Sequence, residues 1–175
     1  VLIMVSSNLK YSLIENILDC QGNLEACGIE LFLKQDRMSI ISVYRPPTAS
    51  RINSRMWQNF FANFHGKVFI GEDFNLPSDQ IIPLEKGILD LDIIVLNDDS
   101  RTFWDAERDH WSKLDLSLAS SSLGIKTSWL VNQDSWGSDH FRIFINMNIS
   151  VTPKSKVRRS PKLYSSKTDW AVFSE

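Results

Sequence analysis

The stretch that decides the fold is residues 67–75, which read Lys-Val-Phe-Ile-Gly-Glu-Asp-Phe-Asn. The apolar run Val68–Ile70 is typical of a buried strand, and Asp73 and Asn75 follow that run two residues apart. Catalytic groups often gather where a strand ends. Asp and Asn are also ordinary turn formers, so this motif alone leaves a catalytic and a structural interpretation open.

Apolar runs bounded by turn residues predict further strands on both sides of this motif. The expected strands are Val1–Ser6, Ala26–Leu33, Ser39–Tyr44, Lys67–Ile70, Asp115–Ala119, Ser128–Gln133 and Phe141–Ile149.

Arg51–His65 is predicted to form a helix, because its apolar residues follow the spacing of one buried helical face and Ser50 or Asn53 is available as the N-cap. A shorter helical or irregular stretch is expected at Pro83–Leu91, and a loop with a short edge strand at Asn97–Trp111. Strands mixed with helices and many hairpin-like returns predict an α/β sandwich.

Composition and charge bound the organisation of the chain. Its 175 residues, 43% of them hydrophobic, suffice for one domain with a real core. The apolar runs are far shorter than the roughly 20 residues of a membrane-spanning helix. Residues 151–175 hold six Lys or Arg against two Asp or Glu, which leaves 13 against 19 before them. We therefore expect a domain over residues 1–150 and a basic linker over residues 151–175.

Three more motifs carry groups suited to phosphate chemistry. Tyr44 and Arg45 end a strand at two prolines and present a hydroxyl and a guanidinium, both able to contact phosphate oxygens. Asp115 begins a strand and is suited to orienting an imidazole. Asp139 and His140 lie at a strand boundary, where an acid can hold a metal or water and a His can act as general base. Taken singly, each motif is as well explained by packing or by a surface turn.

Their order along the chain is more informative than any one of them. Tyr-x-Pro, Gly-x-Asp-x-Asn, Ser-x-Leu-Asp and Ser-Asp-His follow one another here as they do in the exonuclease III and abasic-endonuclease superfamily. The phrases Ile-Ile-Ser-Val-Tyr-Arg-Pro-Pro, Ile-Val-Leu-Asn-Asp, Lys-Leu-Asp-Leu-Ser-Leu-Ala-Ser and Gly-Ser-Asp-His-Phe resemble more specifically the endonuclease/exonuclease/phosphatase domain of non-LTR retrotransposon polyproteins, over roughly residues 1–149.

This resemblance implies a two-sheet α/β sandwich of the DNase I-like fold and a role for each matching residue. His140 would transfer the proton at the scissile phosphate, with Asp115 orienting it. Asp73 and Asn75 would position water and phosphate, and Tyr44 would donate a hydrogen bond to the phosphate or leaving oxygen. The remaining implied roles are phosphate binding by Arg45 and Ser138 and metal binding by Asp139.

The implied activity is Mg²⁺- or Mn²⁺-dependent nicking of target DNA, leaving a 3′-hydroxyl that primes reverse transcription of the element's RNA. The implied setting is the nucleus, with a monomeric chain, no membrane partner, and contact with the RNA through a reverse transcriptase beyond the linker.

Two departures from the family pattern favour an alternative. The family's first-strand Asn and its principal metal ligand, a Glu, have no match here, so we expect a fragment that lacks the N-terminal strands and is inactive alone. Glu72 stands where the family usually has a second Gly. The alternative is a catalytically dead remnant that at most binds nucleic acid. Inositol phosphatases, sphingomyelinases and deadenylases share the Asp-x-Asn and Ser-Asp-His motifs but lack the Tyr-Arg-Pro-Pro and Leu-Asn-Asp phrases.

Overall fold

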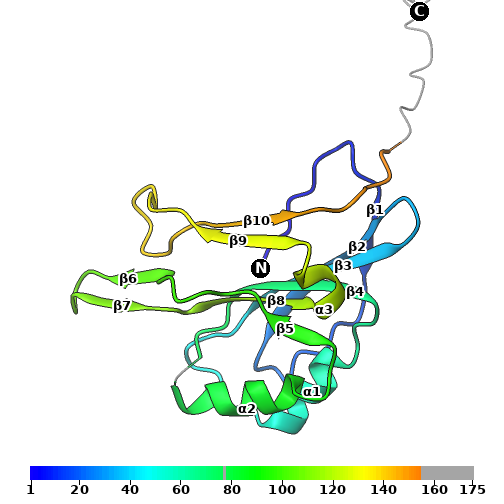
Figure 1. The fold of residues 1–175 in the computed structure, drawn as a ribbon. Helices are drawn as coiled ribbons and strands as arrows, with labels where there is room; N and C mark the ends of the chain where they lie inside the picture. Colours follow the sequence, from blue (N-terminus) through cyan, green and yellow to red (C-terminus); the bar gives the residue numbers. More distant parts are fainter. Residues whose placement is uncertain (77, 155–175) are drawn as a thin grey trace, which may run out of the picture.

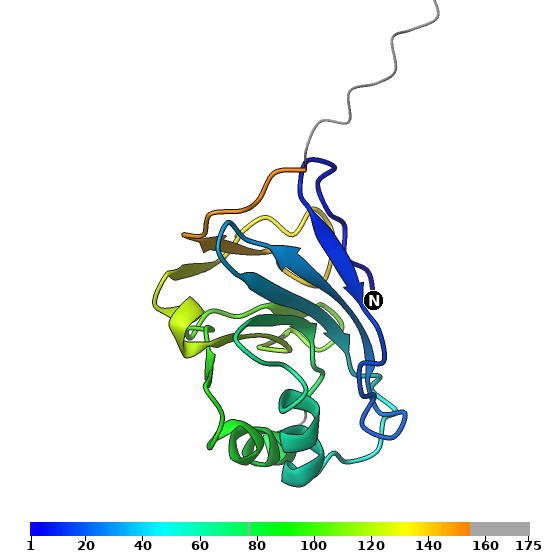
Figure 2. The same ribbon diagram turned by 90° about the vertical axis from the view of Figure 1, so that its right-hand side faces the viewer.

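The architecture is a six-stranded mixed sheet with the two longer helices on one face and a short helix and a small two-stranded sheet on the other (Figures 1 and 2). It was obtained as a computed structural model, which describes residues 1–76 and 78–154. The helices and strands are β1 (Tyr11–Ile14), β2 (Glu25–Phe32), β3 (Arg37–Tyr44), α1 (Ser54–Phe61), β4 (Lys67–Asp73), α2 (Ser78–Ile88), β5 (Ile93–Val95), β6 (Phe103–Asp105), β7 (His110–Ser112), β8 (Asp115–Ser120), α3 (Ser121–Gly124), β9 (Thr127–Val131) and β10 (Ile143–Met147).

The main sheet has the strand order β1-β2-β3-β4-β8-β5. Strands β3 and β4 are parallel and connected through α1, whereas β8 runs antiparallel to both of its neighbours, β4 and β5. Strands β9 and β10 form one two-stranded sheet, and β6 and β7 form another. In Figure 1 the β6–β7 hairpin extends beyond the sheet beside the loop that joins β9 to β10.

Alternation along the central strands divides the core into two clusters. Val68 and Ile70 of β4 pack against α1 and α2, whereas Phe69 faces the opposite side, where α3 and the end of β10 cover the sheet. Helix α1 adds three buried aromatic side chains to the first cluster. Asn53 is the N-cap of this helix, and its side chain accepts a hydrogen bond from Met56 N at 3.0 Å. The predicted α/β sandwich is therefore confirmed.

Most of the expected strands and the first helix are present with shifted ends, and three expectations were wrong. Val1–Ser6 forms no strand, because a strand needs a partner for its backbone groups and residues Leu2–Met4 instead line a cavity of about 410 Å³. The second helix begins at Ser78 and passes through Pro83. Only one short edge strand was expected in the loop over Asn97–Trp111, whereas the segment contains all of β6 and most of β7, which pair as a hairpin.

Two strands were not expected at all, β1 and β5. Both lie at the edges of the main sheet, and both are short. Edge strands receive much of their stability from the neighbouring strand, so their own residues carry little signal. Among the described residues, no helix is long and apolar enough to cross a membrane. The expected basic linker falls mostly on residues 155–175, outside the described part of the chain.

Candidate active site

Two carboxylates meet at one end of the main sheet because of strand register. Asp73, the last residue of β4, is the direct cross-strand partner of Asp115, the first residue of β8. Partners in an antiparallel ladder project from the same face of the sheet. Asp73 shares that face with Phe69, so both acids point toward the side that carries β9 and β10.

His140 lies against both carboxylates just before β10. Its Nδ1 is 3.1 Å from Asp115 Oδ1 and 3.0 Å from Oδ2, and its Nε2 is 3.9 Å from Asp73 Oδ2. The backbone of His140 forms an isolated bridge with Phe103, and the two rings meet edge to face at 4.8 Å between centroids. The imidazole is thereby held in one orientation, with Nδ1 engaged and Nε2 turned toward Asp73.

Asp115 affects the protonation of both His140 and Asp73. The pKa of His140 is raised, chiefly because its hydrogen bond to Asp115 favours the charged imidazolium, although burial opposes the shift. The pKa of Asp73 is also raised, first because burial disfavours its charge and second because the negative charge of Asp115 is close. Titratable groups that perturb one another in this way are typical of sites that move protons.

Asn75 closes the β4 end of the site from a left-handed backbone conformation, with φ at 41°. Its side-chain Nδ2 donates to Asp73 Oδ2 at 2.9 Å and to the carbonyl of Arg45 at 3.2 Å, while its backbone N donates to Asp73 Oδ1 at 3.1 Å. Asn tolerates such a backbone better than most residues do. The acid and amide singled out in the sequence are therefore joined into one hydrogen-bonded unit.

Two residues that received no role from the sequence support Asp115. The buried Thr102 accepts a hydrogen bond from Asp115 N through Oγ1 at 3.1 Å. Asn97 donates from Nδ2 to the carbonyl of Asp115 at 2.9 Å and accepts from Ser117 N at 2.7 Å. Asn97 lies in the quoted Leu-Asn-Asp phrase, which was the available signal. Both residues fix the start of β8 and act through Asp115.

Arg45 is buried, contrary to the phosphate-binding role expected for it. Its expected contact with DNA phosphate does not fit its position, because the residue is only 3% exposed. Nη1 donates to the carbonyl of Asn75 at 2.9 Å, and Nη2 donates to the carbonyls of Ala49 and Ser50 at 3.0 and 3.3 Å. The guanidinium thus ties the loop after β3 to the loop after β4, which makes Arg45 a support of the site.

The other three candidate residues, Tyr44, Ser138 and Asp139, are less buried than Arg45. Tyr44 ends β3 and is partly buried, and the next backbone N, of Arg45, donates to the Asp73 carbonyl at 3.0 Å. Ser138 and Asp139 are exposed. The Oγ of Ser138 and Oδ1 of Asp139 each accept from His140 N at 3.1 Å. These two side chains therefore shape the turn that presents His140.

The expected metal would need several donor side chains close together. Within residues 1–76 and 78–154, no group of three or more His, Cys, Asp and Glu side chains is arranged to hold a metal ion. Asp139, the expected ligand, is exposed and bonded to its own turn. Divalent cations such as Mg²⁺ are bound by several oxygen ligands. The described residues therefore do not complete a metal centre by themselves.

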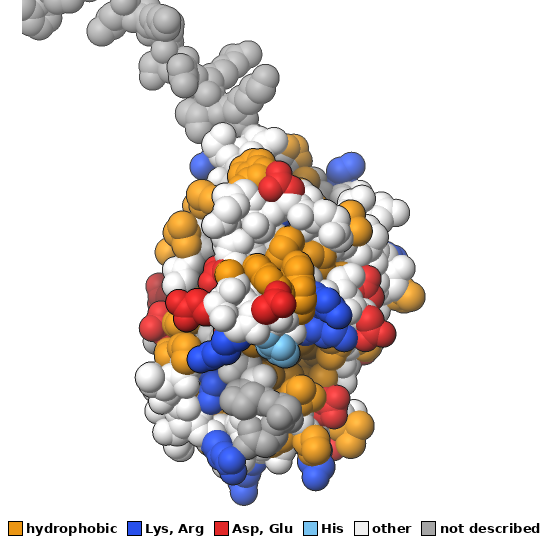
Figure 3. Space-filling view, turned by 90° about the vertical axis from the view of Figure 1, so that its left-hand side faces the viewer, with side chains coloured by type: hydrophobic (Ala, Val, Ile, Leu, Met, Phe, Trp, Pro, Cys, Tyr) orange, Lys and Arg blue, Asp and Glu red, His pale blue; other side chains and the backbone are white. Residues whose placement is uncertain are grey.

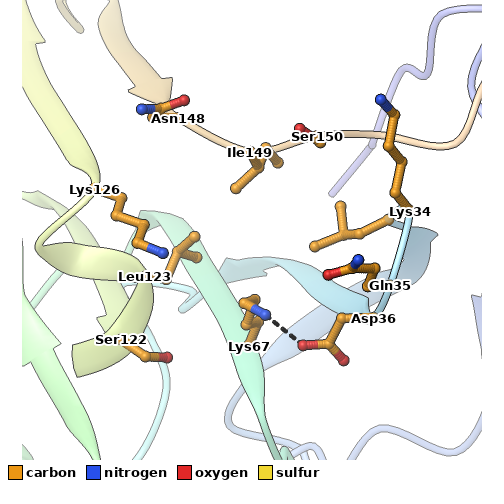
Figure 4. Close-up of a pocket in the computed structure, with 11 residues that line it drawn as sticks. Lys34, Gln35, Asp36, Lys67, Ser122, Leu123, Lys126, Asn148, Ile149 and Ser150 are labelled. Carbon is orange, nitrogen blue, oxygen red and sulfur yellow. Dashed lines mark hydrogen bonds and ion pairs between the residues drawn. The ribbon is translucent and has the colours of Figure 1, made fainter.

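A pocket at the other end of β4 is not part of this site. It has a volume of about 370 Å³ and lies between the β2–β3 turn, α3 and the segment after β10 (Figure 4). Lys67, which forms an ion pair with Asp36 there, begins β4, whereas Asp73 ends it. Six steps along a strand amount to about 20 Å. The pocket and the carboxylate–histidine cluster thus occupy opposite ends of β4.

Comparison with solved structures defines the class of protein. The endonuclease domain of TRAS1, a telomere-specific non-LTR retrotransposon, superposes with a TM-score of 0.66 at 17% identity, covering 81% of this chain and 68% of that one. An endonuclease/exonuclease/phosphatase family protein from Leptotrichia buccalis superposes at 0.53 with 15% identity, covering 71% and 53%. Truncated Caenorhabditis elegans TDP2 superposes at 0.52 with 14% identity, covering 82% and 68%. The fold is that of DNase I-like endonuclease/exonuclease/phosphatase proteins.

The family follows from the sequence match. Residues 38–144 match the family model described as endonuclease-reverse transcriptase, and this span includes Tyr44, Asp73, Asp115 and His140. The chain belongs to the endonuclease-reverse transcriptase family, whose fold relatives are hydrolytic nucleases and phosphatases. No curated protein sequence matches it.

Proposed function

We propose that this chain carries the proton-transfer part of a DNA endonuclease site that nicks target DNA by phosphodiester hydrolysis. The observation that supports it best is the position of His140, whose Nδ1 is engaged by Asp115 at 3.0 Å while Nε2 faces Asp73 at 3.9 Å. An imidazole held in one tautomer by a carboxylate can accept a proton from water through its other nitrogen.

In this proposal each residue around His140 has a separate role in the hydrolysis. Asp115 keeps Nδ1 protonated and stabilises the imidazolium that forms when Nε2 takes the proton. Asp73 and Asn75 form the hydrogen-bonded pair that orients the attacking water and the phosphate. Tyr44 donates to the phosphate or the departing oxygen, and Ser138 binds phosphate from the exposed turn. Release of the 3′-oxygen leaves the hydroxyl from which the element's RNA is copied by a reverse transcriptase.

Dependence on Mg²⁺ or Mn²⁺ is part of the proposal through the family resemblance, with Asp139 as one ligand. The described residues do not complete such a centre, so no step of the proton transfer is assigned to the metal. The nucleus is the proposed location and target DNA the proposed partner. The acidic pair Asp73 and Asp115 repels phosphate, and a divalent cation would offset that repulsion.

A second candidate is a catalytically inactive relative that only binds nucleic acid. The absence of a three-ligand metal cluster among the described residues favours it, as does Glu72 at a position where the family usually has Gly. The two candidates differ in whether any form of the chain cleaves DNA.

A nicking assay on supercoiled plasmid tests the proposal. This chain is compared with a form extended upstream of Val1 along the reading frame, each with Mg²⁺ and with EDTA. Mg²⁺-dependent nicking by either form supports the endonuclease, and nicking by the extended form alone supports a required upstream ligand. If neither form nicks the plasmid although circular dichroism shows that the extended form is folded, the endonuclease proposal is overturned in favour of the inactive relative.

A further inference from the structure

The loop that joins β9 to β10 presents an aromatic ring to solvent directly before the site. Trp136 is 76% exposed, and Gly137, Ser138 and Asp139 separate it from His140. Four residues span at most about 14 Å. Figure 1 shows the loop beside the β6–β7 hairpin, and the face on which they lie carries acidic, basic and apolar side chains together (Figure 3).

Hydrogen bonds within this loop hold the backbone at the ring in a defined conformation. Asn132 Oδ1 accepts from Asp134 N at 3.0 Å, and Asp134 Oδ1 accepts from Trp136 N at 2.9 Å. Trp136 has a φ of 55°, the left-handed region that bulky residues rarely adopt. Gly137 follows with a φ of 83°. The loop therefore holds a large apolar ring outward in a conformation that a smaller residue would occupy more easily.

Arg142 covers one side of the ring. The guanidinium carbon lies 3.7 Å from the Trp136 ring centroid, and Nε and Nη2 donate to the Asp134 carbonyl at 3.3 and 3.1 Å. The same guanidinium lies 5.9 Å from the ring of Phe144, which is 52% exposed. Because one face of the indole is occupied and most of the residue is exposed, the other face is open to a ligand.

We infer that Trp136, backed by Arg142, is a stacking platform for an unpaired base of the DNA strand held at His140. This inference rests on the proposed function. Flat aromatic rings stack on any base, and the guanidinium behind the ring adds a cation–π contact that holds the indole in place. At 3.4 Å per base step, a span of at most about 14 Å corresponds to four nucleotides or fewer between the ring and His140. The ring would hold a base displaced from the duplex near the nick.

The test uses a duplex with a single-nucleotide 2-aminopurine bulge and a fully paired duplex of the same sequence, both without divalent cations. Anisotropy of a terminal dye reports binding, and 2-aminopurine emission reports stacking. The variants are Trp136→Asn, Trp136→Phe and, as the matched control, Tyr11→Asn, which removes a 44% exposed ring from β1. Asn suits the left-handed backbone of position 136, so the thermal midpoint of Trp136→Asn is expected to stay unchanged.

The unaltered chain is expected to quench the bulged base. Trp136→Asn should abolish the quenching and raise the Kd for the bulged duplex about fivefold or more, with a smaller effect on the paired duplex. Trp136→Phe should retain most of the quenching, and Tyr11→Asn should behave like the unaltered chain. Undiminished quenching by Trp136→Asn, or equal loss of affinity for both duplexes, would overturn the platform alone. Absence of DNA binding by every variant, in this chain and in the extended form with Mg²⁺ alike, would overturn the platform and the proposed function together.

Discussion

Asp73 and Asp115 are direct cross-strand partners at the end of the β4–β8 ladder, and the imidazole of His140 approaches both carboxylates, at 3.9 Å and 3.0 Å. Two like charges on one face of a sheet repel each other. The imidazole offsets that repulsion when it is protonated, which couples the charge of all three groups.

Replacing His140 with Ala should lower the rate of plasmid nicking by about 10²- to 10⁴-fold in whichever form of the chain nicks, because the proton acceptor is lost. The circular dichroism spectrum should change little, since His140 is partly exposed. His110→Ala, at an exposed position of β7, is the control. A His140→Ala variant that nicks at the normal rate would remove His140 from the mechanism.

The rate of nicking should rise with pH as Nε2 of His140 loses its proton. Because Asp115 raises the pKa of His140, the inflection should lie above the ordinary value of 6.5. Asp115→Asn removes the strongest cause of that shift, so its inflection should move to lower pH while the maximal rate falls. Single-turnover rates between about pH 5 and 9 measure both. An inflection that stays in place would exclude Asp115 as the group that controls the imidazole.

The free energy of unfolding should depend on pH through Asp73, whose pKa is raised in the folded state. A carboxyl whose pKa is raised in the folded state stabilises the fold only while protonated, and that contribution is lost as pH rises above its ordinary 3.8. Asp73→Asn has no such proton to lose. Its free energy of unfolding, relative to the unaltered chain, should therefore increase from about pH 3 to pH 5, where His140 is protonated in both. Urea denaturation measures the difference, and a change of opposite sign would mean that the carboxylate is stabilised in the fold.

Arg45→Lys should destabilise the chain although the charge is kept. A lysine ammonium cannot reach the carbonyls of Asn75, Ala49 and Ser50 in the planar arrangement of a guanidinium. We expect a loss of about 2 kcal/mol or more in the free energy of unfolding. Arg55→Lys, at an exposed position of α1, should be neutral. Normal stability combined with weaker, less salt-dependent DNA binding would restore Arg45 as a phosphate contact.

Gly87→Ala should also destabilise the chain, against the usual preference of helices for Ala. Gly87 is buried in α2, and a Cβ there would lie 2.5 Å from Trp57 Cβ of α1 and 3.2 Å from the Ser54 carbonyl. Overpacking of this kind costs about 1–3 kcal/mol, more than the roughly 1 kcal/mol of helix propensity gained. Urea denaturation should show no comparable loss for Glu85→Ala, which is exposed on the same helix. Equal stability of the two variants would mean that α1 and α2 can separate freely.

Much of the fold was predictable because its signal is local. The central strands β3, β4 and β8 carry apolar residues at strand period, and α1 carries them at helical period. The N-cap of α1 was narrowed to two residues, of which Asn53 makes the bond. The edge strands β1 and β5 were missed, and Val1–Ser6 was wrongly expected to be a strand. Whether a segment becomes a strand depends on a partner strand, which the composition of the segment does not indicate.

The sequence by itself determined the family, the α/β class and the identity of the acid, amide and imidazole groups, since these depend on motif order and short-range periodicity. Only the tertiary structure decided how those groups meet. Strand register placed Asp73 opposite Asp115, although they are far apart in the chain. Carbonyls from two loops enclosed Arg45, and a hairpin brought Phe103 against His140. Hydrogen-bond partners and burial come from residues distant in sequence, which is why Arg45, expected to contact DNA phosphate, is instead a buried support of the site.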